Sequence, residues 1–366
     1  MLARGYSPSP QAVGAAADAY RADPSAENLL RLQAAAEPPR QELFRRLNMA
    51  PGGTAALVHM RAMLLRGLEA KPHWRVIDAD LLHLLRSWFN RGFLRLERID
   101  WRTSALVLEK LIEYEAVHAI AGWGDLRRRL EADRRCFAFF HPQLPDEPLI
   151  FIEVALTRGM SAHVQPLLDV RAPLADPATA DCAMFYSITN CQDGLRGISF
   201  GNLLIKQVAG ELKRELPQLR RFATLSPIPG FRRWLGELTL PPEESALLER
   251  LEDPAWPLGE VPESLQKLLQ RLCAYYLLHA KRASSPEPRD PVARFHLGNG
   301  AALERLNWMG DSSEQGISRS AGMMVNYVYW LDEVERNQDR YFRERHIVAS
   351  SSVTRLAREA PLFQKP

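Results

Sequence analysis

The first 88 residues carry the apolar pattern of helices. Apolar side chains recur every three or four residues on both sides of the break "APGGT", and again in "DADLLHLLRSWF". Thr54, the last residue of this break, is the N-cap that the pattern predicts for the helix that follows. No polar cluster in this stretch points to chemistry. We therefore expect residues 1–88 to form a small helical bundle that serves packing or assembly.

From about Phe89 onward the pattern becomes that of strands. Two apolar runs rich in β-formers, "RCFAFFH" and "PLIFIEVAL", flank the turn segment "PQLPDEP" and predict a hairpin. A third run, "DCAMFYSIT", is followed by the loop "NCQDGLRG", a helical segment and a fourth run, "RRFATL". This order predicts a β-α-β unit with parallel strands, in a sheet covered on both faces. We expect residues 89–366 to form a second domain.

The last part of the chain is dense in small polar residues. His296 lies in an apolar run after the polar connection "SSPEPRDP". A loop rich in serine and glycine follows over residues 309–322, and we expect it to contact a ligand. The segment after this loop carries Asn326, Tyr327 and Tyr329, and we expect it to be a helix.

Composition narrows the class of protein. Apolar residues make up 46% of the chain and charged residues 25%, which is typical of a globular protein, and a net charge of +3 gives no indication of nucleic-acid binding. No apolar run has the length of about 18 residues that a membrane helix needs. The cysteines lack the spacing of a disulfide framework or a zinc site, so we expect reduced thiols and a cytoplasmic location; they are Cys136, Cys182, Cys191 and Cys273.

Known catalytic and metal-binding motifs give little further indication. None of the nine histidines has the spacing of a metal site, so no metal is expected. The P-loop pattern, the G-x-S-x-G elbow and the G-x-G-x-x-G dinucleotide pattern after a first strand are also missing.

The segment "FATLSPIPGF" places one serine between an apolar run and two prolines. Pro227 favours extended backbone at Ser226, and Pro229 with Gly230 turns the chain. By residue type alone, a turn cap is the commoner role of such a serine. However, Ser226 and the loop "NCQDGLRG" both follow parallel strands, whose carboxyl ends line one crevice.

The same loop has the character of a phosphate site. It leads into a helix N-terminus, where unpaired N–H groups and the helix dipole favour an anion. Gly194, Gly197 and Gly201 would let a pyrophosphate approach the backbone. Glycine also serves ordinary turns and helix starts, so this pattern alone leaves both interpretations open.

Several pieces of the second half, taken in order, resemble the malonyl-CoA decarboxylase family. They are "EAVH", "FYSITNCQDGLRGISFGNLLIKQV", "LSPIPGF", "FHLGNGA", "NWMGDSS" and "GISRSAGMMVNY", and the resemblance covers roughly residues 89–353. It implies an α+β, multidomain chain: a helical oligomerisation domain, then a catalytic domain with the mixed sheet and flanking helices of the acetyltransferase (GNAT) fold. It also implies a homotetramer that converts malonyl-CoA to acetyl-CoA and CO₂ without a metal or organic cofactor.

The resemblance also assigns roles to residues. Ser226 corresponds to the family's catalytic serine, His296 to its catalytic histidine, and Tyr329 to a tyrosine near the site. The acyl-CoA loop corresponds to Arg196, Gly197, Ile198, Ser199, Phe200, Gly201 and Asn202. Two positions depart from the family pattern: Ser199 stands where some members have a carboxylate, and Ala105 stands where animal members have a cysteine for a disulfide between subunits.

Decarboxylation of a malonyl thioester leaves an electron pair that the thioester carbonyl accepts as an enolate. The enolate carbon must then be protonated, and we expect His296 to give that proton while Ser226 hydrogen-bonds His296 and holds the substrate carboxylate or relays the proton. We expect Phe200, Ile228 and Phe231 to supply an apolar pocket. Two other functions fit the same crevice: a CoA-dependent acyltransferase and an acyl-CoA sensor without catalysis.

Overall fold

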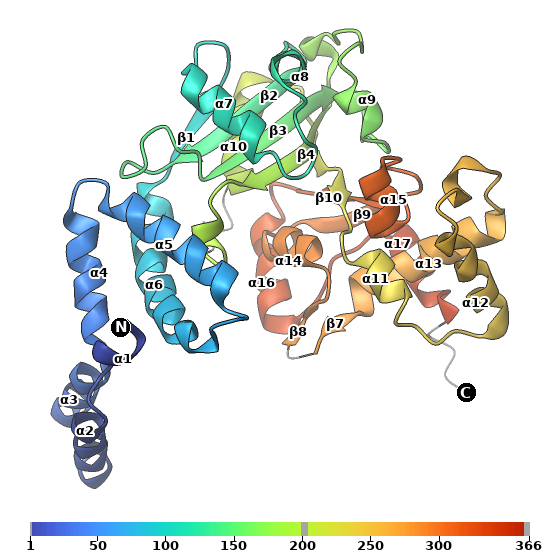
Figure 1. Ribbon diagram of the computed structural model, residues 1–366. Coiled ribbons are helices and arrows are strands. Elements are labelled where there is room, and N and C mark those ends of the chain that lie inside the picture. The colour runs from blue at the N-terminus through green and yellow to red at the C-terminus, as the bar shows by residue number, and fades with distance from the viewer. Residues whose placement is uncertain (1, 199–203, 284, 362–366) are drawn as a thin grey trace.

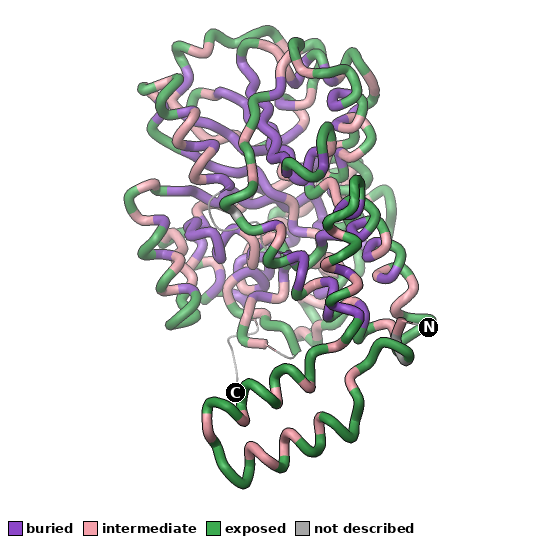
Figure 2. The backbone as a smooth tube through the Cα atoms, turned by 90° about the vertical axis from the view of Figure 1, so that its left-hand side faces the viewer, coloured by how far each residue is buried: buried purple, intermediate pink, exposed green. Residues whose placement is uncertain are grey.

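The structure is a computed structural model that describes residues 2–198, 204–283 and 285–361. Its N-terminal region is helical, as the pattern predicted, but it is not one bundle. Helices α2 and α3 form a hairpin that projects from the body and buries none of its residues, whereas α5 and α6 pack against the rest of the molecule (Figures 1 and 2). The helices of this region are α1 (Leu2–Gly5), α2 (Pro10–Ala22), α3 (Ala26–Ala36), α4 (Pro39–Met49), α5 (Gly53–Gly67) and α6 (Arg75–Trp88).

The predicted cap of α5 was wrong. The helix begins at Gly53, and Gly52, with φ of +70°, occupies the N-cap position. A Cβ on Gly53 would lie 1.7 Å from the carbonyl oxygen of Leu47, so the turn into α5 requires glycine there. Thr54 lies one position inside the helix, and its hydroxyl donates to Asn48 Oδ1 at 2.8 Å.

A mixed sheet forms the centre of the described chain. Its strand order is β1-β2-β3-β4-β5-β10-β6, and β9 pairs with β10. The hairpin and the β-α-β unit are confirmed: β2 and β3 pair antiparallel, and β4 and β5 pair in parallel. The strands are β1 (Arg95–Ile99), β2 (Arg134–Phe140), β3 (Ile150–Thr157), β4 (Cys182–Asn190), β5 (Arg221–Thr224), β6 (Ser226–Pro227), β9 (Ala302–Asn307) and β10 (Met324–Val328).

The segment that carries Tyr327 is a strand, so the prediction of a helix was wrong. β10 pairs with β9 on one edge and with β5 and β6 on the other. Alternate residues of "MMVNYVY" face opposite sides of the sheet and are buried on both, which a sequence cannot distinguish from a buried helix. Part of the polar connection before His296 forms the strand β8 (Ser285–Pro288), which pairs antiparallel with β7 (Lys281–Arg282), just before the connection.

Helices cover both faces of the sheet. Residues of α7 (Ala105–Tyr114) and α8 (Trp123–Arg129) pack on the face that Cys136 and Phe140 share, and α10 (Leu204–Glu215) packs on the opposite face. The expected α+β class, with a mixed sheet and flanking helices, is confirmed. The longer helices that follow are α12 (Pro242–Glu249), α13 (Glu263–His279), α14 (Pro291–Gly298), α15 (Glu314–Ser320), α16 (Val334–Glu344) and α17 (Ser351–Arg358); the short ones are α9 (Gln165–Leu168) and α11 (Phe231–Leu235).

The largest apolar core is continuous from the N-terminal helices to the sheet. It includes Leu57 of α5 and Leu81 of α6 together with Phe185 of β4 and Val208 of α10. The division of the sequence at residue 88 therefore does not coincide with a break in the core. The assignment of residues 1–88 and 89–366 to two domains stays a prediction.

One feature of the sheet creates room for a ligand. The parallel pairing of β4 with β5 ends at Phe185 and Thr224, and the N–H of Leu225 closes it by donating to the Phe185 carbonyl at 2.9 Å. Beyond this point β4 continues to Asn190, paired only with β3 among the described strands, while β6 pairs with β10. The two strands separate, and one edge of β4 is left open.

Candidate active site

A pocket of about 210 Å³ lies where β4 and β5 separate. Ser226 and His296 line it, and both are nearly buried, with 5% and 3% of their surface exposed. Most of the other lining residues are apolar: Val117, Phe185, Tyr186, Ile188, Leu225, Pro227, Pro291, Val292 and Phe295, with Ser187 and Asn190.

This apolar lining differs from the one expected from the sequence. Ile228 and Phe231 are fully buried in the core and do not line the pocket, because the chain turns away after β6. Phe200 lies outside the described residues. Leu225 of the strand exit and Phe295 of α14 take their place.

Three side chains that sequence analysis singled out form one hydrogen-bonded chain. Ser226 Oγ lies 3.0 Å from His296 Nε2, and His296 Nδ1 lies 2.8 Å from the hydroxyl of Tyr329. The expected hydrogen bond between Ser226 and His296 is thus present. All three residues are buried, although 70 positions separate the serine from the histidine.

Local sequence explains how α14 delivers the imidazole. Asp290 caps the helix by accepting from the Ala293 N–H at 2.8 Å, and Pro291 occupies the first turn. His296 follows in the last turn, where the ring of Tyr327 stacks on the imidazole with centroids 4.6 Å apart. The position of His296 is therefore fixed from both the helix and β10.

Burial decides the charge of this histidine. Desolvation lowers the pKa of His296 from its ordinary value of 6.5 to about 3, because the imidazolium form would lose its hydration. The ring is therefore neutral at pH 7, with one protonated and one unprotonated nitrogen. Burial also raises the pKa of Tyr329 well above its ordinary value of 10, so its hydroxyl keeps its hydrogen.

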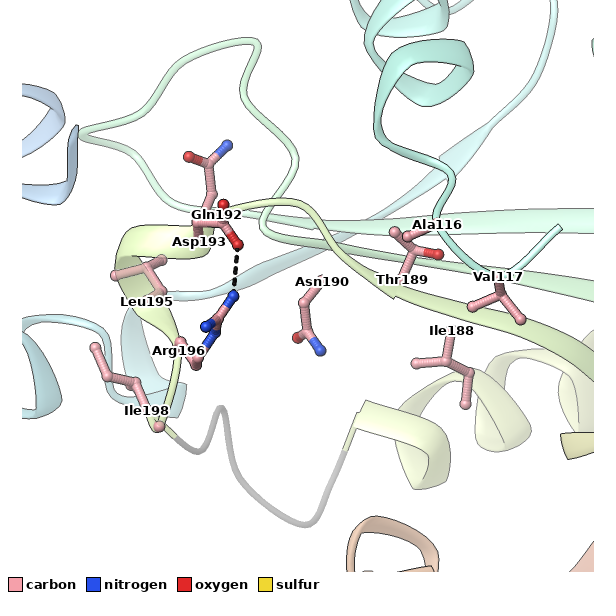
Figure 3. A pocket seen from close by; sticks show the side chains of 11 residues that line it. Ala116, Val117, Ile188, Thr189, Asn190, Gln192, Asp193, Leu195, Arg196 and Ile198 are labelled. Atoms are coloured by element: carbon pink, nitrogen blue, oxygen red, sulfur yellow. Dashed lines mark hydrogen bonds and ion pairs between the residues drawn. The ribbon is translucent and has the colours of Figure 1, made fainter. Parts of the chain in front are cut away.

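A larger pocket of about 390 Å³ adjoins the first. The two share Val117, Ile188 and Asn190, and in Figure 3 the Asn190 side chain points into the space between β4 and the following loop. The loop and Ser226 thus open onto one crevice, as the sequence predicted. Of the predicted acyl-CoA loop, Arg196, Gly197 and Ile198 line this pocket, while Ser199, Phe200, Gly201 and Asn202 lie outside the described residues.

The N-terminal helices hold this loop from behind. Arg61 of α5 is 2% exposed, and its guanidinium donates to the Gly194 carbonyl at 2.7 Å and to Asp78 Oδ1 at 2.8 Å. A Cβ on Gly194 would lie 1.9 Å from the carbonyl oxygen of Val58. From α6, Arg86 donates to the Gly197 carbonyl at 3.3 Å.

A buried carboxylate fixes the opposite wall. Glu115, in the segment "EAVH", accepts from the backbone N–H groups of Val117 and His118 at 2.7 and 2.9 Å. It also accepts from the hydroxyl of Ser187 on β4 at 2.8 Å. Glu115 therefore ties the segment that contains Val117 to the open end of β4.

Family models match both parts of the chain. The malonyl-CoA decarboxylase N-terminal domain matches residues 6–89, and the malonyl-CoA decarboxylase C-terminal domain matches residues 92–365. The chain belongs to the malonyl-CoA decarboxylase family.

Solved structures and curated relatives agree with this assignment. The malonyl-CoA decarboxylase structure from Rhodopseudomonas palustris is 51% identical, with a TM-score of 0.93 over 97% of this chain and 88% of that one. The one from Agrobacterium vitis is 50% identical, with a TM-score of 0.90 over 97% and 89%. The mitochondrial malonyl-CoA decarboxylase of the goose Anser anser anser is 40% identical over 86% of this chain and 69% of its own length.

The serine- and glycine-rich loop that we expected to contact a ligand does not lie at these two pockets. The loop over residues 309–322 lines neither of them; it forms the short helix α15, capped by Ser313, whose hydroxyl accepts from the Gly316 N–H. Asp311 accepts from the Gln165 side chain at 2.8 Å. The density of small polar residues there serves local hydrogen bonding.

Two residues with direct contacts to the site were missed. Thr224 lies 2.8 Å from Ser226 Oγ, and Glu115 holds the wall of both pockets. The sequence could have indicated Thr224, because it lies two positions before Ser226 and alternate residues of a strand share a face. Within the described ranges, no group of three side chains could hold a metal ion, and no helix is long and apolar enough to span a membrane.

Proposed function

We propose that this chain decarboxylates malonyl-CoA to acetyl-CoA and CO₂, with Ser226, His296 and Tyr329 as its catalytic group. Membership of the malonyl-CoA decarboxylase family supports the reaction. The observation that carries the roles is the buried chain of hydrogen bonds from Ser226 through His296 to Tyr329, at the end of an apolar pocket.

The two adjoining pockets suit the two ends of a CoA thioester. The larger pocket faces the loop that contains Arg196, which we propose binds the nucleotide end together with Gly197, Ile198, Ser199, Phe200, Gly201 and Asn202. The smaller pocket takes the malonyl end. Between them, the open edge of β4 offers backbone groups to the amides of the pantetheine arm, as a sheet edge does to an added strand.

The pocket around Ser226 suits the loss of a carboxylate. When the bond between the α-carbon and the carboxylate breaks, CO₂ leaves and the electron pair moves into the thioester carbonyl. Apolar neighbours such as Val292 and Phe295 solvate a carboxylate poorly and favour its loss. The enolate carbon then takes a proton from the Ser226–His296 pair, and solvent restores that proton after product release.

One time course tests the reaction against its alternatives. Malonyl-CoA alone is incubated with the protein in D₂O and followed by mass spectrometry. A decarboxylase yields acetyl-CoA with one deuterium in its methyl group and an equal amount of CO₂. An acyltransferase consumes acyl-CoA only when an amine acceptor is added, and a sensor leaves malonyl-CoA unchanged.

We also propose that the chain assembles with copies of itself into a tetramer through its N-terminal region. Helices α2 and α3 have 13 and 11 residues and no buried residue, which is marginal for helices without a partner in water. Leu30 is 65% exposed on this hairpin. A second copy of the hairpin is the occupant that we expect, and light scattering at micromolar concentration measures the assembly.

Turnover without a metal or an organic cofactor, and a cytoplasmic location, stay predictions. The residues proposed for catalysis carry a hydroxyl, an imidazole and a phenol, which suffice for proton transfer. We expect the rate with malonyl-CoA to be unchanged after dialysis against a chelator. A loss of activity that added metal restores would contradict this expectation.

A further inference from the structure

The hydroxyl of Ser226 has two polar neighbours but only one hydrogen. Thr224 Oγ1 lies 2.8 Å away on one side and His296 Nε2 lies 3.0 Å away on the other. The geometry has Ser226 donating to Thr224. The lone pairs of Ser226 Oγ are then free to accept, so the hydrogen between Ser226 and His296 belongs to Nε2.

The state of the second imidazole nitrogen follows. Buried His296 is neutral and has one N–H, so a hydrogen on Nε2 leaves Nδ1 as an acceptor. Its partner at 2.8 Å is the Tyr329 hydroxyl, which must then donate. All three hydrogen bonds point the same way, from Tyr329 to His296, to Ser226 and to Thr224.

Thr224 is itself held as an acceptor. It is fully buried at the end of β5, and its Oγ1 also accepts from the backbone N–H of Tyr327 at 3.2 Å. The Asn326 side chain donates to the Thr224 carbonyl at 2.7 Å, so β10 fixes both ends of the residue. Two donors, Ser226 and Tyr327, thus occupy the two lone pairs of the threonine hydroxyl.

We propose that Thr224 is a positioning residue that sets the tautomer of His296, by drawing the Ser226 hydrogen to itself and leaving Nε2 as the protonated nitrogen. The effect of this tautomer on catalysis rests on the proposed function; the tautomer itself does not. With the hydrogen on Nε2, Ser226 can turn its own hydrogen from Thr224 to the enolate carbon while the Nε2 hydrogen replaces it, so the pair acts as a proton donor. With Ser226 donating to Nε2 instead, His296 would face the pocket as a base.

The first test reads the tautomer in the resting protein. Full-length protein labelled with ¹⁵N at histidine is studied by solid-state NMR, and His296 is assigned by the signals that a His296→Asn variant loses. Protonated and unprotonated imidazole nitrogens have well separated shifts. We expect Nε2 to be protonated and Nδ1 to be unprotonated; the opposite pattern in the parent protein overturns the proposal without any variant.

The second test removes the acceptor while keeping its shape. Thr224→Val is expected to move the hydrogen of His296 partly or fully to Nδ1, and to lower kcat roughly tenfold with little change in KM, since one hydrogen bond sets the preference. Thr224→Ser keeps the hydroxyl and should restore the Nε2–H signal and most of kcat. A merely structural role would change melting temperature but leave the tautomer as it is in the parent.

The outcomes separate this inference from the proposed function. If Thr224→Val retains the parental tautomer, Thr224 does not set it and the inference fails, whatever the activity. If the variant does not fold, the parent and Thr224→Ser spectra still decide whether Nε2 carries the hydrogen. If the parent shows Nε2–H but malonyl-CoA is not consumed, the tautomer assignment stands and the decarboxylase function fails.

Discussion

The two pockets of this molecule are built in different ways. At the smaller pocket, side chains from β5, β6, α14 and the residue after β10 hydrogen-bond one another, and the proposed catalytic groups are themselves buried. At the larger pocket, helices from the distant N-terminal region hold backbone carbonyls of a loop, as Arg61 holds Gly194. The comparison indicates that the proposed catalytic group depends on the sheet and on α14, whereas the loop that we propose binds the CoA end depends on the N-terminal helices.

The largest effect is expected at the smaller pocket. Ser226→Ala and His296→Asn should each lower kcat at least about 100-fold, because each removes a group that we propose transfers the proton. KM should change little, and circular dichroism should show an intact fold. His59→Asn, an exposed histidine on α5, serves as the matched control and should keep parental activity. Near-normal CO₂ release by the His296→Asn variant would contradict the proposed role of His296 in proton transfer.

A backbone substitution tests the larger pocket. In Gly194→Ala the added Cβ collides with the Val58 carbonyl, so the loop must move away from α5. We expect KM for malonyl-CoA to rise roughly tenfold while kcat changes less, since uniform binding is lost and not transition-state stabilisation. Gly210→Ala on α10, where nothing lies within 4 Å of the new Cβ, is the control. If Gly194→Ala lowers kcat and leaves KM unchanged, the N-terminal helices do not act mainly on substrate binding, and the distinction between the two pockets is wrong.

The buried imidazole of His296 should make the free energy of unfolding depend on pH. Because burial lowers the pKa of His296 to about 3, the unfolded chain binds a proton below pH 6.5 that the folded chain does not. The free energy of unfolding therefore falls with falling pH, by roughly 2 kcal/mol between pH 7 and pH 5 from this residue. Urea unfolding of His296→Asn should show a loss over that interval that is smaller by this amount. Parallel curves for the two proteins would show that the imidazole is hydrated.

The smallest effect on catalysis is expected farthest from both pockets. Leu30→Glu places a charge on the exposed face of the α2–α3 hairpin, where surface substitutions change stability by about 0.5 kcal/mol or less. We expect a smaller assembly in light scattering and a kcat within twofold of the parent. An assembly of unchanged size would contradict the prediction that the hairpin is the contact between copies. A second substitution on the same hairpin, such as Arg21→Glu, would then not be needed.

Much of the smaller pocket could be predicted from sequence, because its groups lie in short ordered motifs. Pro227 favours extended backbone at Ser226, and the family resemblance assigned Ser226 and His296 as a pair, so the pair was expected before their 3.0 Å contact was known. That His296 lies on a helix was not predicted. The helix predicted for the residues before Tyr329 failed because β10 is buried on both faces and shows no alternation.

The supports of the site could not be predicted in the same way. Arg61 and Gly194 are 133 positions apart, and nothing local to either residue shows that a guanidinium will meet that carbonyl. Thr224 reads as one more β-branched strand residue until the strand exit and the direction of the Ser226 hydrogen are known. Sequence motifs therefore indicated the reacting groups, and tertiary structure was needed for the groups that orient them.

The apolar core shared by α5, α6 and the sheet has a practical consequence. A truncated chain that starts at residue 89 would leave the partners of Leu57 and Leu81 facing water and would release the loop at Gly194. A shorter version that begins between α3 and α4 would lose the α2–α3 hairpin, which buries nothing, and α1, of which Leu2 is only partly buried against the core. It would also lose the Tyr6 carbonyl that accepts from Arg40 at 3.2 Å. In calorimetry, α5 and α6 should melt together with the sheet in one transition, so an engineer who wants a minimal enzyme should cut near residue 38 and not at the boundary that the sequence suggests.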